Sequence, residues 1–317
     1  MGAIIDQLLS SDEPSIRYKA HTGVLGADPA SPAMRALGEE VRTSPRVTKL
    51  LSARGENGKI PGGVYQKWMG AHWVLATLAD LGYPSGDAAL APLVEQVCAC
   101  WLGARHVDAV RVINGRVRRC ASQESNALYA LLTLGFHDAR VDRLAENLLR
   151  WQWPDGGWNC DTRPEATTSS FHESWIPVRA LALYARLRDH AGAREAVARA
   201  AEIFLSRRLF RRRRDGSVMT PSFLKLIYPP YWHYSILNGL KVMAEAGCIG
   251  DPRCADALDV LESKRLPDGG FPAEAAYYKT SPSGGNSLVE WGGARAARMN
   301  PWVTAEALGV LAAGGRR

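Results

Sequence analysis

Apolar residues recur at spacings of three and four along most of the chain, which is the periodicity of one face of a helix. Alternating apolar and polar runs, which are typical of strands, are nearly absent. The spacing predicts helices over residues 64–81, 88–102, 122–134, 141–151, 169–187, 193–204, 231–246 and 301–313. We therefore expect an all-α protein.

Glycine-bearing polar loops separate pairs of these predicted helices. They lie at residues 55–58, 114–116, 154–158, 214–217 and 267–271 and recur at intervals of roughly 40 to 60 residues, the length of one helical hairpin. Hairpins of this size bury their apolar faces only against neighbouring hairpins. We expect about five to six hairpins over residues 54–317, with N-terminal helices over 1–53 packing on them, all within one domain over 1–317.

The predicted helices are of two kinds. Those that follow the glycine loops begin with aromatic and polar residues, whereas their partners, such as 141–151, are simple amphipathic helices. Two kinds of helix indicate two concentric rings, an α/α toroid (barrel), rather than an open solenoid. The starts of the inner helices would then surround a central aromatic-lined cavity, with substrate-binding side chains predicted at Trp68, His72, Gln123, Glu124, Trp175, Trp232, Tyr234, Trp291 and Trp302.

One glycine loop carries a longer motif. Residues 148–158, LLRWQWPDGGW, resemble the QW repeat of squalene and oxidosqualene cyclases, in which a glutamine and a Gly-x-Trp element tie an outer helix to the next inner helix. A weaker copy covers residues 261–271, with Arg265 at the glutamine position. The Gly-Gly-Trp/Phe element is also similar to that of protein prenyltransferase β-subunits. The resemblance implies a toroid of the terpenoid cyclase and protein prenyltransferase superfamily, and an enzyme that acts on an apolar or isoprenoid substrate.

The chain also departs from these families. The Asp-x-Asp-Asp acid motif of squalene-hopene cyclases is missing, as are the Asp-Asp-x-x-Asp and NSE-type motifs that bind magnesium and diphosphate. The 317 residues make one barrel, whereas those cyclases set their cavity between two. Prenyltransferase β-subunits bind zinc through Asp-x-Cys and a later histidine, whereas here Cys160 and Asp161 are adjacent and His172 follows. The resemblance therefore informs the fold more than the chemistry.

Composition narrows the class of protein further. With 46% hydrophobic and 22% charged residues the chain is ordinary globular, which excludes disordered, collagen-like and coiled-coil proteins. The net charge of +7 includes an arginine cluster over 207–214, but no nucleic-acid-binding motif accompanies it. We interpret the cluster as a solvated loop, or as a contact for a partner subunit of the kind that prenyltransferase β-subunits need.

Location and redox state also follow from the sequence. No apolar run reaches the ~18 residues of a membrane span, and the six cysteines form no paired C-x-x-C motif. We expect a cytoplasmic protein with reduced thiols and without a membrane span.

Asp161 is the predicted proton donor. It directly follows the Gly-Gly-Trp loop, so its side chain should face the mouth of the toroid, where Cys120, Cys160 or His172 would hold it. Burial in an aromatic-walled pocket would raise the pKa of its carboxyl and allow protonation of an alkene or epoxide. The competing interpretation is that Asp161 only caps a loop or helix.

Cys160, Asp161 and His172 are alternatively ligands of a catalytic zinc ion, with Cys120 or His233 as a further ligand. Thiolate, imidazole and carboxylate suit zinc, and three protein ligands leave one position open. Glu173 and Glu124 begin inner helices, where they are either catalytic or simply placed to favour the helix dipole. The sequence does not decide whether a cofactor is present.

Two functions of other classes stay open. His233 and Tyr234 lie in the densest aromatic segment, residues 228–234, and resemble the acid-base set of a toroidal polysaccharide lyase. That function requires contact between the two side chains and a basic cleft. A binding module without catalysis, for a small molecule or a protein, would instead show no perturbed acid.

Overall fold

The computed structural model describes residues 2–281 and 285–316, and it confirms the prediction of a mainly helical protein. The α-helices are α1 (Gly2–Leu9), α2 (Pro14–Lys19), α3 (Pro32–Thr43), α4 (Pro45–Leu51), α5 (Ala71–Leu81), α6 (Ala91–Trp101), α7 (Ala104–Asp108), α8 (Ala121–Thr133), α9 (Ala139–Trp151), α10 (Phe171–Arg188), α11 (Ala191–Leu205), α12 (Ile236–Glu245), α13 (Ala255–Glu262) and α14 (Pro301–Ala313). A π-helical turn covers Ala20–Val24, and short 3₁₀ helices cover Ala88–Leu90, Pro221–Leu224 and Pro252–Cys254.

Two of the predicted helices begin later than the periodicity indicates. Residues 64–70 form a turn before α5, in which a side chain at Gly70 would collide with the carbonyl oxygen of Val64. Residues 231–235 precede α12. Tyr231 follows two prolines and adopts a left-handed backbone (φ 50°), which interrupts a helix. The helix begins after Ser235, whose side chain accepts a hydrogen bond from the Asn238 backbone amide. Several aromatic residues expected on inner helices therefore lie on loops.

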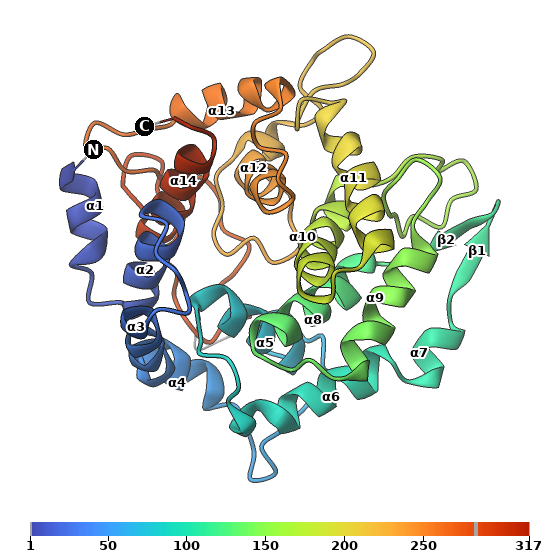
Figure 1. Cartoon of the computed structure of the whole chain (residues 1–317), viewed down its shortest axis with the longest axis horizontal. Coiled ribbons are helices and arrows are strands. Elements are labelled where there is room, and N and C mark those ends of the chain that lie inside the picture. The colour runs from blue at the N-terminus through green and yellow to red at the C-terminus, as the bar shows by residue number, and fades with distance from the viewer. Residues whose placement is uncertain (1, 282–284, 317) are drawn as a thin grey trace.

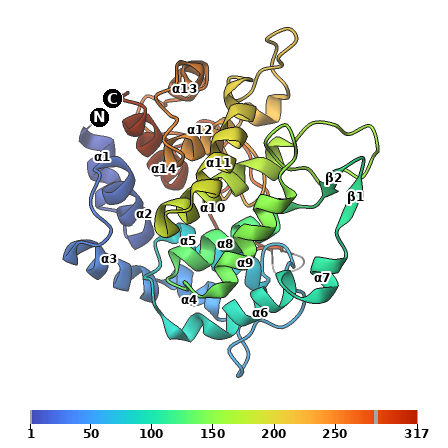
Figure 2. The same ribbon diagram turned by 45° about the vertical axis from the view of Figure 1, so that its right-hand side comes forward.

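A β-hairpin occupies one of the glycine loops. Strands β1 (Arg111–Ile113) and β2 (Arg116–Arg118) pair antiparallel across Asn114 and Gly115. Both turn residues have positive φ, 51° and 69°, as a two-residue type I′ turn requires. The hairpin projects from the edge of the molecule (Figure 2) and directly precedes α8.

Six helices contact one another in a closed cycle. Helix α2 packs against α5, α5 against α8, α8 against α10, α10 against α12, α12 against α14, and α14 returns to α2. Helices α6, α9, α11 and α13 lie outside this cycle (Figure 1), where α6 and α9 pack on α8, α11 packs on α10, and α13 packs on α12. The two chain ends lie near each other as a result, since α14 closes against the N-terminal helices (Figure 1).

The core fills the space between the cycle and the outer helices. Many alanines and leucines of α5, α8 and α10 are almost fully buried, among them Leu78, Leu131 and Leu181. Within the described residues, none of the helices combines the length and the apolar character that a membrane crossing requires.

Candidate functional site

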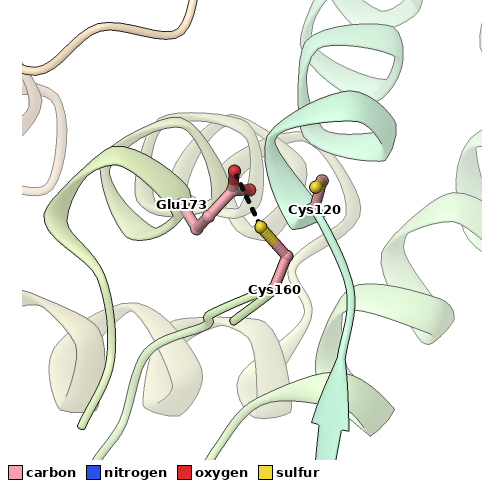
Figure 3. A group of neighbouring side chains, drawn as sticks. All are labelled: Cys120, Cys160 and Glu173. Carbon is pink, nitrogen blue, oxygen red and sulfur yellow. Dashed lines mark hydrogen bonds between the residues drawn. The ribbon is translucent and has the colours of Figure 1, made fainter. Parts of the chain in front are cut away.

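Two thiols and a carboxylate meet where α8 and α10 begin. Cys120 directly precedes α8, Cys160 lies on the loop between α9 and α10, and Glu173 is in the first turn of α10. Their ligand atoms all lie within 4.8 Å of one another, and the Cys160 thiol donates to Glu173 Oε1 at 3.7 Å (Figure 3). We call these three residues the Cys–Cys–Glu cluster. In the part of the chain that the structure describes, this is the one group of three or more such residues gathered closely enough to hold a metal ion.

The QW-like loop positions Cys160. The Gln152 side-chain amide donates to the carbonyl oxygens of Gly156 (2.7 Å) and of Ala196 on α11 (2.8 Å). The Trp158 indole donates to the Leu148 carbonyl of α9 at 2.9 Å, and the Trp158 backbone amide donates to Ser174 Oγ on α10 at 3.1 Å. The loop is therefore bonded to α9, α10 and α11, and Cys160 follows two residues after this anchored tryptophan.

The hairpin fixes the other side of the cluster. Arg118, buried at the end of β2, donates to the carbonyl oxygens of Asp161 (3.0 Å) and Ala166 (2.8 Å). Its guanidinium lies 4.5 Å from the ring centroid of Trp153. Since Cys120 comes two residues after Arg118, these bonds hold the Cys120 and Cys160 segments together.

Burial perturbs the acidic groups of the cluster. Desolvation raises the pKa of the Glu173 carboxyl, although the Ser122 backbone amide donates to Glu173 Oε2 at 3.1 Å and opposes the rise. The hydrogen bond with Cys160, together with burial, raises the pKa of the Cys120 thiol well above its usual range. Burial and the neighbouring Glu173 charge raise the pKa of Tyr65, which also bonds Gln123.

Asp161 does not have the environment predicted for a buried proton donor. Its side chain forms a bidentate ion pair with the exposed Arg163, with Nε 3.0 Å from each carboxylate oxygen, and its backbone amide bonds Asn159. The hydrogen bonds from the Arg163 side chain and from the Arg163 backbone amide lower the pKa of the Asp161 carboxyl to about 2. The expectation of a raised pKa is wrong, because the side chain points toward solvent and a cation rather than into an apolar pocket.

The predicted set Cys160, Asp161 and His172 is not brought together. His172 Nδ1 accepts the Tyr234 backbone amide at 2.9 Å, and its ring packs edge-on against Trp232 and Phe223. Burial lowers the pKa of His172. Glu173, the next residue, enters the cluster in its place.

Glu124 is fully buried one turn into α8. Its Oε1 bonds His106 Nε2 at 2.5 Å and Arg119 Nε at 3.3 Å, whereas Oε2 has no partner among the described residues. Glu124 therefore ties α7 to α8, while its neighbour Gln123 bonds Tyr65 beside the cluster.

Most of the predicted tryptophans pack against other aromatic rings. Trp68 stacks on Tyr231 with a centroid distance of 3.8 Å, and Trp291 and Trp302 form an edge-to-face pair at 5.2 Å. The Trp175 indole donates to the Trp232 carbonyl at 3.1 Å. These contacts make the tryptophans part of the aromatic packing beside the helix starts.

His72 lies in the same aromatic packing. It is fully buried between Trp73, Trp101 and Tyr65, and its Nδ1 accepts the Trp101 indole N–H at 3.1 Å. Burial lowers the pKa of His72 to about 3, so the ring is neutral at neutral pH.

His233 and Tyr234 have separate partners. His233 stacks between Trp232 and Tyr277, and burial lowers its pKa to about 4. The Tyr234 hydroxyl is buried and donates to the Leu209 carbonyl at 2.7 Å. A lyase would need this hydroxyl beside the substrate, so the arrangement does not favour that function.

A cavity of about 820 Å³ lies toward the other ends of the same helices, and the sequence pattern gave no prediction of it. Its wall includes Asp80, Arg179, Lys241 and Glu245 but none of the predicted tryptophans. Asp80 accepts bonds from Lys19 Nζ (3.0 Å) and from the Tyr228 hydroxyl (2.9 Å). Charged residues within otherwise apolar helices, such as Asp80 on α5 and Lys241 on α12, were the available signal.

Comparison of the chain with known protein families, with curated proteins and with solved structures gives no match. The geometry of the site and the motif resemblance are therefore the basis for a function.

Proposed function

We propose that this protein is a zinc-dependent enzyme of the terpenoid cyclase and protein prenyltransferase type, acting on an apolar or isoprenoid substrate. The observation that carries the proposal is the Cys–Cys–Glu cluster, in which three zinc-type ligand atoms lie within 4.8 Å of one another. Three protein ligands leave a fourth position for water or substrate, as in catalytic zinc sites.

The residues fit the proposed metal. Zinc bonds sulfur at about 2.3 Å and carboxylate oxygen at about 2.0–2.2 Å, so tetrahedral ligands lie roughly 3.5–4 Å apart. Side-chain rotations that shorten the longest of these separations, which are at most 4.8 Å, by about 1 Å would bring the ligand atoms to that spacing. Ser122, which donates its backbone amide to Glu173 Oε2, would orient the carboxylate while Oε1 turned to the metal.

The closed cycle of helix contacts supports an α/α toroid. Its members α5, α8, α10, α12 and α14 alternate along the chain with the outer helices α6, α9, α11 and α13. The bonds that Gln152 and Trp158 make to three helices are those expected of a QW-type loop.

The surroundings of the cluster favour an apolar substrate. Tyr65, whose pKa responds to Glu173 and Cys120, joins the cluster to the rings of His72, Trp73 and Trp101. These rings exclude water, and their faces attract a developing positive charge by about 0.5–2 kcal/mol each. A bound zinc ion would supply a Lewis acid or an activated thiolate there, while Glu173 and Tyr65 would orient the reacting group.

Elemental analysis of protein purified without a histidine tag tests the proposal. We expect about one zinc per chain in the parent protein, and a loss of most of it in Cys160→Ala and in Glu173→Gln. Cys248→Ala is the matched control, because Cys248 is a half-buried free cysteine outside the cluster. Equal metal content in all four proteins, or none in the parent, would refute the zinc site.

A second candidate function is metal-free acid catalysis by Glu173. The specific observation in its favour is a buried carboxyl with a raised pKa, the property first expected of Asp161. A parent protein without zinc, in which Glu173→Gln abolishes conversion of an isoprenoid alkene or epoxide and Asp161→Asn does not, would favour this candidate.

A further inference from the structure

Cys120 and Cys160 come from separate parts of the chain and meet at one place. Cys120 directly precedes α8, and Cys160 lies on the loop between α9 and α10 (Figure 3). Beside them, Arg118 and Asn159 form a parallel β-bridge, so the two backbones run next to each other at about the 4.7–4.9 Å spacing of neighbouring strands. Arg118 also donates hydrogen bonds to two carbonyls of the Cys160 loop. The two thiols are therefore neighbours because the backbone segments that carry them are bonded together.

The two sulfur atoms are close enough to be joined by side-chain rotation. They lie at most 4.8 Å apart. A disulfide needs a sulfur–sulfur distance of about 2.05 Å and Cα atoms about 4.4–6.8 Å apart, and neighbouring strands lie within that Cα range. Rotation of both side chains about their Cα–Cβ bonds would therefore close the gap while the two backbone segments keep their places.

The pair is also open to small reagents. Cys120 and Cys160 are both half-buried, so a small molecule reaches them from the solvent. By contrast, Cys98 and Cys100 lie two residues apart on α6, so their side chains point in different directions. Proximity and access therefore coincide at Cys120 and Cys160.

We propose that Cys120 and Cys160 are a reversible redox modification site, at which a low-molecular-weight disulfide converts the two thiols into an intramolecular disulfide. One cysteine attacks the reagent, so a mixed disulfide forms and a first small thiol leaves. The second cysteine attacks the cysteine sulfur of this mixed disulfide, so the Cys120–Cys160 bond forms and a second small thiol leaves. The cysteines lose two electrons and two protons, and the reagent takes up both as it becomes two thiols. The fixed positions of the two segments favour the second step, because it is intramolecular.

The disulfide would regulate the Cys–Cys–Glu cluster. The thiolate is the form of cysteine that binds metals, so the disulfide removes both sulfur ligands and leaves Glu173 as the remaining ligand of the cluster. Oxidation would thus release zinc, and reduction would allow it to bind again. This regulation rests on the proposed zinc-dependent function, whereas the disulfide itself requires no zinc.

Non-reducing peptide mapping by mass spectrometry tests the proposal, on protein equilibrated with an excess of oxidised glutathione. Trypsin separates the two cysteines, because Arg140, Arg143 and Arg150 lie between them. One sample is used as purified, and a second is first freed of metal with a chelator. In most chains of both samples we expect a cross-link that joins the peptides of Cys120 and Cys160. A zinc indicator should show that the sample used as purified loses most of its zinc.

Two variants accompany the parent protein. Cys160→Ser should form no such cross-link. Cys100→Ser is the matched control, because Cys100 is a half-buried free cysteine outside the cluster, and it should form the cross-link as the parent does. The map of the parent protein decides the question even if Cys160→Ser fails to fold.

The outcomes separate the disulfide from the zinc site. The disulfide is overturned if Cys120 and Cys160 of the metal-free sample stay as thiols or carry only glutathione, whatever the zinc content of the protein. A parent that contains no zinc would refute the zinc site and its regulation but not the disulfide. A protein that contains zinc and keeps it in the same buffer would overturn the regulation.

Discussion

Asp80→Asn would remove the carboxylate at the centre of the buried ion-pair network. Asp80 accepts from Lys19 at 3.0 Å and from Tyr228 at 2.9 Å, and Lys241 and Arg179 lie 3.5 and 3.7 Å away. The variant keeps the shape of the side chain but leaves three cations with one anion fewer.

The cost follows from how buried these charges are. Breaking a fully buried ion pair costs about 3–5 kcal/mol, whereas an exposed pair contributes about 0–1 kcal/mol. The Asp80 side chain is 20% exposed, and that of Lys19 is 10% exposed. We therefore expect the variant to lose about 3 kcal/mol of unfolding free energy, near the lower limit for buried pairs.

Urea denaturation followed by circular dichroism measures the loss. The control is Asp138→Asn, because Asp138 pairs with Arg140 at the exposed start of α9, and asparagine caps a helix as well as aspartate. The control should change the unfolding free energy by less than about 1 kcal/mol. A loss below about 1 kcal/mol in Asp80→Asn would refute the account of the network.

Three further variants test other parts of the structure. Gly157→Ala would place a methyl carbon 2.5 Å from Ile203 Cδ1 and 2.6 Å from Ser174 Oγ. We therefore expect it to lower the unfolding free energy measured in urea by about 1–3 kcal/mol. An unchanged denaturation midpoint would contradict this close packing. Gln152→Ala removes two hydrogen bonds to backbone carbonyls and should lower the unfolding free energy by about 1–3 kcal/mol in the same assay. An unchanged unfolding free energy would show that other contacts hold the loop. The pKa of His72 is about 3 in the folded protein and 6.5 when unfolded, so the unfolded chain binds the extra proton and stability falls as pH drops from 6.5 toward 3. Between pH 6.5 and 4, the unfolding free energy of His72→Phe should therefore fall less steeply than that of the parent protein. Parallel curves for the two proteins would show that His72 is not buried as a neutral ring.

The helical character of the fold could be predicted because amphipathic periodicity is local. The helix at 141–151 is the clearest case, since one face of it is apolar and α9 covers Ala139–Trp151. The starts of α5 and α12 could not be predicted, because residues 64–70 and 231–235 carry aromatic residues at helical spacing yet form turns and loops. Aromatic residues at helical spacing do not distinguish a helix from such a loop. The hairpin was missed because its strands have three residues each, although Asn114-Gly115 is a strong turn signal.

The candidate site could be predicted in part. The position of Cys160 after an anchored Gly-Gly-Trp loop follows from the motif, and Cys120 and Glu173 were among the candidate residues. Which acid joins the cysteines could not be read from the sequence, because Asp161 and Glu173 differ only in where their loop and helix point them. The cavity was missed, although the charged residues Asp80, Lys241 and Glu306 interrupt otherwise apolar helices.

Zinc K-edge X-ray absorption on the purified protein tests the central claim most directly. The account predicts a zinc ion with two sulfur ligands at about 2.3 Å and oxygen ligands at about 2.0–2.2 Å, and a loss of most of this zinc signal in Cys120→Ala. A spectrum with only nitrogen and oxygen ligands, or with three or more sulfur ligands, would contradict the Cys–Cys–Glu site.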